Sequence, residues 1–220
     1  MGEAELNIDS GELIIRSVFY FYGDGANELL ALQMAEDIST LWNKPEAAIT
    51  IKKNHYAIRF EIEGIYEPGI APEKVWYNDN PRFNFFRIEQ FVTGNISFVD
   101  GIGCNTGYLK IENILQTTST IAHEYGHTLG LVHPAVTDIR GGLDPCIMYP
   151  RGTLSDSGLQ YDPLAQAATP GGTLDPKYRK VTLTDISNLH LHKLDFNESG
   201  IAKVGEFSSI YHEKHLEGFA

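Results

Sequence analysis

Residues 120–134 read TIAHEYGHTLGLVHP and contain the pattern H-E-x-x-H-x-x-G-x-x-H in full. If residues 119–129 form a helix, His123 and His127 lie one turn apart on one face, close enough for both imidazoles to bind one metal ion. Glu124 then projects beside them. The spacing therefore predicts a helix that carries two metal ligands and a carboxylate.

A third ligand requires the chain to turn back after this helix. A straight helix would carry His133 roughly 15 Å further along its axis than His123, because each residue adds about 1.5 Å. Gly130 has no Cβ atom, so it can adopt a positive φ, end the helix and return the chain towards the metal. Three neutral imidazoles and one water molecule form the open tetrahedral site of a catalytic zinc ion. We therefore predict one Zn²⁺ bound by His123, His127 and His133.

Glu124 is the candidate general base at this site. Zinc lowers the pKa of a water molecule that it binds, and a neighbouring carboxylate can take a proton from that water and deliver it to a leaving amine. The pattern therefore predicts hydrolysis of amide bonds, with Glu124 as the general base. The alternative is three unrelated histidines on and after an ordinary helix. Average composition would produce the full pattern by chance in on the order of one such chain in a hundred thousand.

Residues 146–150 add a resemblance to a known family. They read CIMYP, and with the histidine pattern they resemble the metzincin clan of zinc endopeptidases, in which a methionine in a tight turn lies beneath the metal. The resemblance implies that Met148 supports the imidazoles without binding the metal. Met-Tyr-Pro is similar to the matrixin branch, whereas Pro134 directly after His133 is similar to the serralysin branch. The chain thus resembles the clan more than any one branch.

Tyr149 and Pro150 depart from the pattern of two branches. In astacins and serralysins a tyrosine two positions after the methionine binds zinc or contacts the transition state, but Pro150 occupies that position here. We therefore expect Tyr149 to be a packed aromatic at the floor of the substrate pocket, beside Pro150. Residues 135–146 are longer than the matching matrixin segment. We expect them to help form the S1′ wall, next to the substrate residue that follows the scissile bond.

Composition limits the remaining classes of function. The chain has 220 residues, of which 42% are hydrophobic, and a net charge of −12, which fits one globular domain. No apolar run approaches the roughly 20 residues that cross a bilayer, and the 17 basic residues form none of the clusters that bind phosphate. We expect a monomer that acts on a protein or peptide substrate, with no nucleic-acid partner and no membrane span.

The start of the chain and its two cysteines leave alternatives open. Residues 1–10 are polar and acidic and lack the basic and apolar regions of a signal peptide. We expect a secreted or exported protein, either as a mature or excised domain or by another route. Cys104 and Cys146 do not make a disulfide scaffold. One bridge and two reduced thiols both fit the sequence.

The order of the remaining patterns favours one fold. Strand composition recurs in residues 12–22, 49–51, 55–62, 82–92, 95–99 and 108–111. Residues 26–43 carry an apolar helical stripe, residues 67–81 and 151–180 have loop composition, and a last helix begins at Thr182 and keeps its stripe to Leu194. This order resembles a metzincin-like zincin of the α+β class. The resemblance implies a twisted, mostly parallel five-stranded sheet, two long helices, a methionine turn and a C-terminal helix.

The segment before the zinc helix has two further candidate sites. The resemblance implies that an edge strand pairs antiparallel with an extended substrate, and the candidate strand consists of Asn95, Ile96, Ser97, Phe98 and Val99. Asp100 and Asn105 on the following Gly-rich loop offer oxygen ligands for a structural Ca²⁺. Asx turns without a metal are the alternative.

These patterns together predict one catalytic domain over residues 1–220, with an N-terminal subdomain to about residue 130 and a C-terminal subdomain over about residues 131–220. We expect a zinc-dependent endopeptidase. Two alternatives differ in function: a zinc-binding module without turnover, against which the intact Glu124 argues, and a protease of narrow specificity that acts as a toxin or effector. The absence of a signal pattern in residues 1–10 favours the second alternative.

Overall fold

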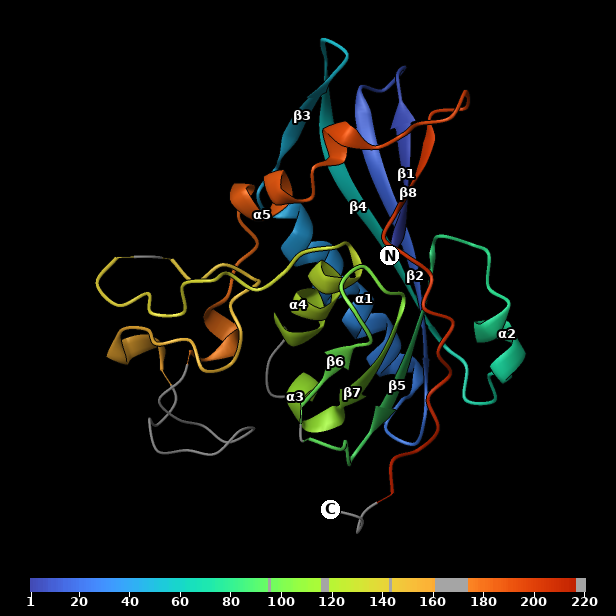
Figure 1. Ribbon diagram of the computed structural model, residues 1–220, viewed down its shortest axis with the longest axis vertical. Coiled ribbons are helices and arrows are strands. Elements are labelled where there is room, and N and C mark those ends of the chain that lie inside the picture. Colours follow the sequence, from blue (N-terminus) through green and yellow to red (C-terminus); the bar gives the residue numbers. More distant parts are fainter. Residues whose placement is uncertain (95, 116–118, 143, 161–173, 217–220) are drawn as a thin grey trace.

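The computed structural model describes residues 1–94, 96–115, 119–142, 144–160 and 174–216. Its centre is a mixed β-sheet with helices across one face (Figure 1). The strands are β1 (Gly2–Asn7), β2 (Glu12–Tyr22), β3 (Ala48–Ile51), β4 (Asn54–Tyr66), β5 (Phe83–Glu89), β6 (Phe98–Val99), β7 (Thr106–Lys110) and β8 (Ile201–Val204). The α-helices are α1 (Glu28–Asn43), α2 (Pro72–Trp76), α3 (Ile111–Leu115), α4 (Ser119–Thr128) and α5 (Leu183–Asn188). Short 3₁₀ turns cover Ser157–Leu159, Pro176–Tyr178 and Leu191–Lys193.

Strand β2 organises the sheet. β4 runs parallel to β2 along one edge, and β3 pairs antiparallel with β4. The other edge of β2 is shared, because β1 pairs antiparallel with its first half and β5 pairs parallel with its second half. β7 follows β5 in parallel, and β6 closes this side through an antiparallel pairing with β7. The short β6 is therefore the last strand on the side of the sheet nearest α3 and α4 (Figure 1).

The sheet is larger and less parallel than the five-stranded, mostly parallel sheet expected from the sequence. The described residues form eight strands, and β1, β3, β6 and β8 all pair antiparallel. β1 and β8 were missed because their buried faces carry small side chains, such as Ala4 and Ala202, which give little hydrophobic periodicity. The acidic residues of β1 have partners in the fold, since Glu5 pairs with Arg16 and Glu3 with Arg82.

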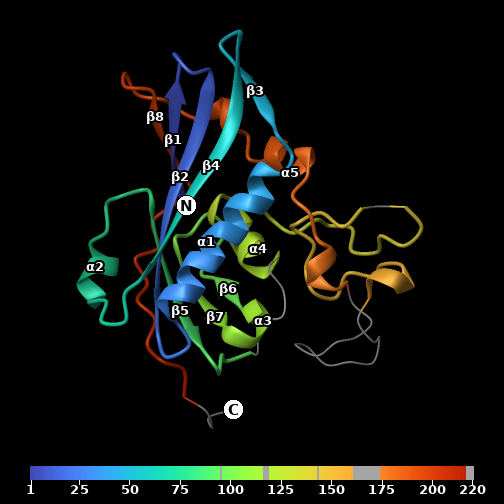
Figure 2. The ribbon, with the colours of Figure 1, turned by 180° about the vertical axis from the view of Figure 1, so that it is seen from behind.

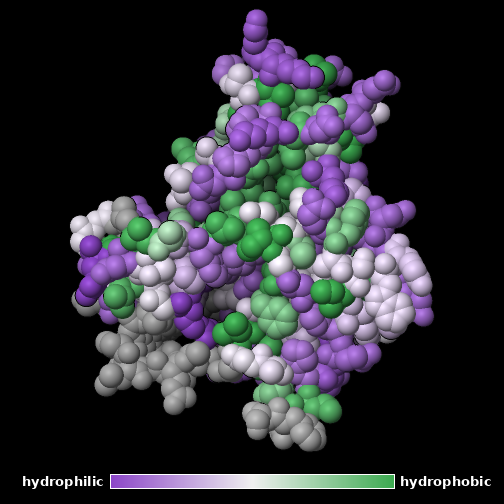
Figure 3. Space-filling view, in the orientation of Figure 1, coloured by the Kyte–Doolittle hydropathy of each residue, from purple (hydrophilic) through white to green (hydrophobic). Residues whose placement is uncertain are grey.

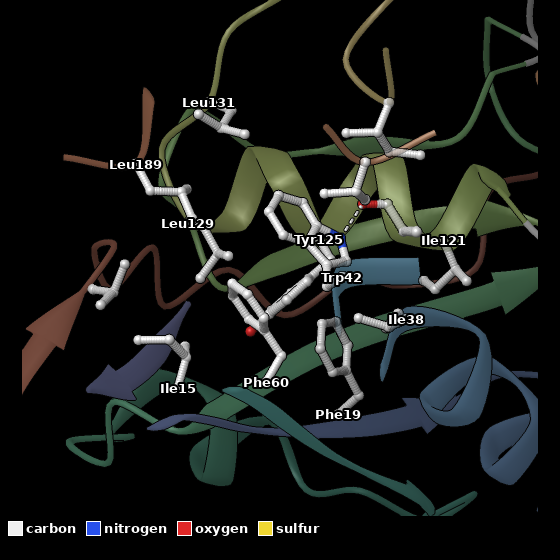
Figure 4. Close-up of a cluster of buried hydrophobic side chains, with 14 of the residues drawn as sticks. Ile15, Phe19, Ile38, Trp42, Phe60, Ile121, Tyr125, Leu129, Leu131 and Leu189 are labelled. Carbon is white, nitrogen blue, oxygen red and sulfur yellow. Dashed lines mark hydrogen bonds between the residues drawn. The ribbon is translucent and has the colours of Figure 1, made fainter. Parts of the chain in front are cut away.

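Helix α4 is buried beside α1 on the same face of the sheet (Figures 1 and 2). All ten of its residues are buried. Tyr125 packs edge-on against Phe19 of β2 and Trp42 of α1, and the Trp42 indole donates a hydrogen bond of 3.0 Å to the Ala122 carbonyl (Figure 4). The Tyr125 hydroxyl also lies 3.0 Å from Ser17 Oγ. These contacts fix the helix against β2 and α1, so the side chains on its open side are held on a rigid support.

The opposite face of the sheet has its own smaller core. Tyr20, Tyr22, Ile70, Val75 and Phe85 pack together there. Helix α2, which lies on this side (Figure 2), falls within residues 67–81, where the sequence predicted only a loop. Pro72 favours the start of this helix, because its fixed φ suits the first turn and a backbone N–H at that position would have no acceptor within the helix.

The C-terminal helix is shorter than predicted. α5 begins as expected, with the Thr182 and Asp185 side chains forming a capping box. It ends at Asn188 rather than near Leu194, because His190 adopts a left-handed conformation with φ of 50°. The chain then returns to the sheet as β8, which pairs with β1. In the part of the chain that the structure describes, no helix has the length and apolar character needed to cross a membrane.

Candidate metal centre

Three imidazoles converge at the open side of α4. The Nε2 atom of His133 lies 3.1 Å from Nε2 of His123 and 3.0 Å from Nε2 of His127. Two nitrogen ligands about 2.1 Å from a zinc ion at the tetrahedral angle are about 3.4 Å apart. A small outward movement of the rings therefore fits the ion. Within the described ranges, this is the one group of three or more His, Cys, Asp or Glu residues whose ligand atoms gather closely enough to hold a metal.

The other nitrogen of two rings is bound to a carbonyl. His123 Nδ1 lies 2.7 Å from the Ile147 carbonyl oxygen, and His127 Nδ1 lies 2.8 Å from that of Leu131. A carbonyl can only accept, so each Nδ1 carries the proton and each Nε2 directs a lone pair into the site. The main chain around Met148 and the turn after α4 thus orient the two ligands that α4 contributes.

A glycine turn brings in the third ligand. Helix α4 ends at Thr128, and Gly130 has φ of 101°, a region that side-chain-bearing residues rarely adopt. The Leu131 amide donates to the Gly126 carbonyl at 3.0 Å, which closes the helix end as in a Schellman motif. His133 follows on the returning chain, and it is the exposed member of the triad.

Burial keeps the site in the protonation state that metal binding needs. It is the largest cause that lowers the pKa of His123 and His127 below the usual range, and it lowers the pKa of His133 to about 4. Neutral imidazoles are the form that binds metal. Burial also raises the pKa of Glu124 to about 8, although the charge of Arg179 acts in the opposite direction. A cation at the triad would favour the Glu124 carboxylate in the same way.

Residues 146–150, which we call the methionine run, lie against α4. Met148 is buried, and a Cβ atom on Gly126 would overlap its Sδ atom. Tyr149 is buried with Ile139 and Leu174, and it lines a cavity together with His133 and Met148. Gly126 was not singled out from the sequence, although its place inside the histidine pattern is what allows the methionine to approach so closely.

Two cavities meet at the triad, in the hollow visible at the centre of the face in Figure 3. The first, of about 240 Å³, is lined by Glu124, Arg151 and Arg179 among others, and we call it the arginine cavity. Pro150 also lines it. The second, of about 310 Å³, extends along Phe98 and Val99 to Ile102. An extended chain could therefore pass the triad with side chains on either side of it.

The edge strand is shorter than the predicted segment of residues 95–99. Only Phe98 and Val99 form β6, Ile96 and Ser97 precede it, and Asn95 lies outside the described residues. The Ser97 hydroxyl accepts hydrogen bonds from the Lys110 amide at 3.1 Å and from Asn113 Nδ2 at 3.2 Å. A side chain thus replaces the main-chain acceptor that would have continued the ladder.

Asp100 and Asn105 use their oxygens in hydrogen bonds. Asp100 lies 2.9 Å from His212 Nε2 and accepts from the Thr106 hydroxyl. Asn105 Oδ1 accepts from the Ser208 amide at 2.9 Å. These contacts attach the C-terminal segment to the sheet. These long-range partners differ from the local Asx turns of the alternative, and the structural Ca²⁺ stays a prediction.

Arg179 is the site residue that the sequence did not reveal. It follows the 3₁₀ turn Pro176–Tyr178, which is held against the start of α4 by a hydrogen bond from the Ser119 hydroxyl to the Pro176 carbonyl. Only 5% of Arg179 is exposed, and its charge acts on Glu124 and on all three histidines. It lies 55 positions after Glu124 in a stretch without periodicity, so no spacing rule connects the two.

Comparisons with known proteins add little to this geometry. No model of a protein family matches the chain, and no curated protein sequence matches it. Among solved structures it is similar to a chain described as "Structure of a chaperone-substrate complex", with 15% identity and a TM-score of 0.40. The match covers 83% of this chain and 34% of the other, so this chain spans about a third of that neighbour. A likeness of this size carries no argument about activity.

Proposed function

We propose that this protein is a zinc-dependent endopeptidase related to the metzincin clan. The observation that carries the proposal is the convergence of three Nε2 lone pairs beside the buried Glu124, at the place where two cavities meet. A structural zinc site would be closed by a fourth protein ligand. Within the described residues, the metal-binding group contains three.

The residues around the triad account for each proton in the reaction. When bound, zinc polarises the scissile carbonyl and lowers the pKa of water. Glu124 accepts a proton from the attacking water as the new C–O bond forms. It then donates that proton to the amide nitrogen as the C–N bond breaks, which leaves a free amine and a carboxylic acid. His123 and His127 keep their geometry throughout, because their Nδ1 atoms are held by the Ile147 and Leu131 carbonyls.

The cleft favours an extended protein chain as substrate. Among the residues that the structure describes, β6 pairs with β7 alone, and its residues line the second cavity next to the triad. A peptide that adds to the free edge gains main-chain hydrogen bonds that do not depend on its sequence. Such a peptide has cavities on both sides of the triad for its side chains, which favours cleavage within an extended chain.

The test is cleavage of an unstructured protein such as casein by the purified chain, with and without a zinc chelator, together with metal analysis. We expect about one zinc per chain and cleavage that stops with chelator and returns with added zinc. Absence of zinc after exposure to the metal would contradict the proposal. Zinc binding without any cleavage would favour the alternative of a binding module without turnover.

A further inference from the structure

The arginine cavity is unlike the rest of this acidic protein. The chain has a net charge of −12, yet two of its 17 basic residues line the cavity of about 240 Å³ that opens on the triad. Glu124 is the one acidic residue among the lining residues described. Arg151 and Arg179 come from different segments, before and after residues 161–173, so their meeting is a product of the fold.

Both arginines are held in place. Arg179 is buried and lines the cavity together with Pro176. The Pro176 carbonyl accepts a hydrogen bond from the Ser119 hydroxyl at the start of α4. Arg151 donates to Asn113 Oδ1 at 3.3 Å, and Asn113 in turn donates to Ser97 Oγ just before β6. The guanidinium of Arg151 is thereby tied to the segment before β6, and the 3₁₀ turn that precedes Arg179 is held against the start of α4. A ligand between them would meet pre-positioned donors.

The direction of the edge strand decides which part of a substrate reaches this cavity. β6 runs from the Ile96 side, beside the arginine cavity, to the Ile102 side, in the second cavity. An extended substrate that adds antiparallel to β6 runs the opposite way. Its residues after the scissile bond therefore enter the arginine cavity, and its residues before the bond enter the second cavity.

We propose that Arg179, assisted by Arg151, binds a substrate carboxylate directly after the scissile bond. The carboxylate comes either from an acidic side chain at that position or from the C-terminus of the substrate. The proposal rests on the endopeptidase function above, and a terminal carboxylate would add carboxypeptidase activity. A planar guanidinium binds a carboxylate through two parallel hydrogen bonds. In a site with little solvent, loss of that partner weakens binding more than at an exposed site.

The test uses peptides of one sequence that differ only at the position after the cleaved bond. Asp, Asn, Glu and Gln are compared in peptides with an amidated C-terminus, and one further peptide ends at that position with a free carboxylate. We expect kcat/KM for Asp or Glu to exceed that for the matching amide by on the order of 10- to 100-fold. Preference for the terminal peptide instead would assign the carboxylate to the chain end.

Substitution of the arginine separates recognition from a structural role. Because the Arg179 charge also acts on Glu124, Arg179→Gln should change turnover of both peptides, so the ratio of kcat/KM for the acidic peptide to that for the amide peptide is the readout, and we expect it to fall on the order of 10- to 100-fold. Arg151→Gln should act in the same direction with a smaller effect. Arg59→Gln, on the exposed face of β4, is the matched control. An equal loss for acidic and amide peptides would overturn the proposal and leave Arg179 as a support for Glu124.

Peptide affinity, measured in a variant that does not cleave the peptide, tests the carboxylate site separately from turnover. In the Glu124→Gln variant, fluorescence anisotropy of labelled Asp and Asn peptides reports affinity without cleavage. We expect the Asp peptide to bind on the order of tenfold more tightly, and Arg179→Gln in this background to remove the difference. Equal affinities would overturn the carboxylate site even if casein is cleaved. Preference for Asp before the bond would overturn its placement. If neither casein nor any peptide is cleaved, the proposed hydrolysis fails, whatever the affinities.

Discussion

Gly126 of α4 contacts Met148 so closely that a Cβ atom on Gly126 would overlap the Met148 Sδ atom. Gly126 lies between His123 and His127 along α4, and the Ile147 carbonyl next to Met148 binds His123. Movement of Met148 would therefore displace the imidazoles of His123 and His127. The glycine inside the histidine pattern serves this contact rather than helix formation, which glycine disfavours.

The effect of Gly126→Ala on the free energy of unfolding should therefore depend on the side chain at position 148. In the wild-type background, overlap costs about 1–3 kcal/mol and exceeds the gain of about 1 kcal/mol from helix propensity, so we expect lower stability and weaker zinc binding. In a Met148→Ala background the overlap with the methionine is gone and Trp42 Cζ2 at 3.3 Å is the close neighbour that stays, so the same substitution should cost less. Urea denaturation of the four proteins measures the coupling. Gly69→Ala, which has open space around it, should have the same effect in both backgrounds.

Zinc binding should release about one proton near neutral pH. Burial raises the pKa of Glu124 to about 8 in the metal-free site, whereas the histidine pKa values are lowered, that of His133 to about 4. Between pH 6 and 7 the lowered pKa values favour neutral imidazoles, and Glu124 holds the proton that a bound cation displaces. Affinity should rise about tenfold per pH unit in this range and become nearly independent of pH in Glu124→Gln. A wild-type slope that Glu124→Gln leaves unchanged would show that the proton comes from the histidines.

Cys146 should react slowly while the chain is folded. The structure leaves Cys104 and Cys146 as free thiols, which decides between the two alternatives that the sequence left open. Burial, together with the charge of Asp185, raises the pKa of Cys146 to about 11. At pH 8 about one such thiol in a thousand is ionised, against roughly a quarter for an unperturbed cysteine. An aromatic disulfide reagent should label it at least about 100-fold faster in urea, and rapid labelling of the folded chain would contradict the burial.

The sequence predicted those parts of the site that depend on local geometry. The spacing of His123 and His127 needs only a helix, and the return of His133 needs only the conformational freedom of Gly130, so both could be read from residues 120–134. Helix α1 was predicted closely for the same reason, since its apolar stripe has a single period. Local chemistry was enough wherever all partners lie within a few turns of one another.

Parts that depend on distant partners could not be predicted in the same way. Arg179 reaches Glu124 only because the Pro176 turn docks on Ser119, and no pattern in residues 151–180 announces that contact. The edge strand stopped short because a serine hydroxyl took the place of a main-chain acceptor. β1 and β8 depend on each other for burial, so neither has a strong signal alone. These are tertiary effects that composition and periodicity do not encode.

The most direct test of the account is Glu124→Gln, measured for zinc content and for casein cleavage in the same preparation. Glutamine keeps the shape of the side chain but cannot accept the proton, so we expect about one zinc per chain, an unchanged fold and cleavage reduced about 100-fold or more. Full cleavage by a zinc-loaded Glu124→Gln protein would contradict the central claim that this carboxylate is the base of a metal-dependent peptidase.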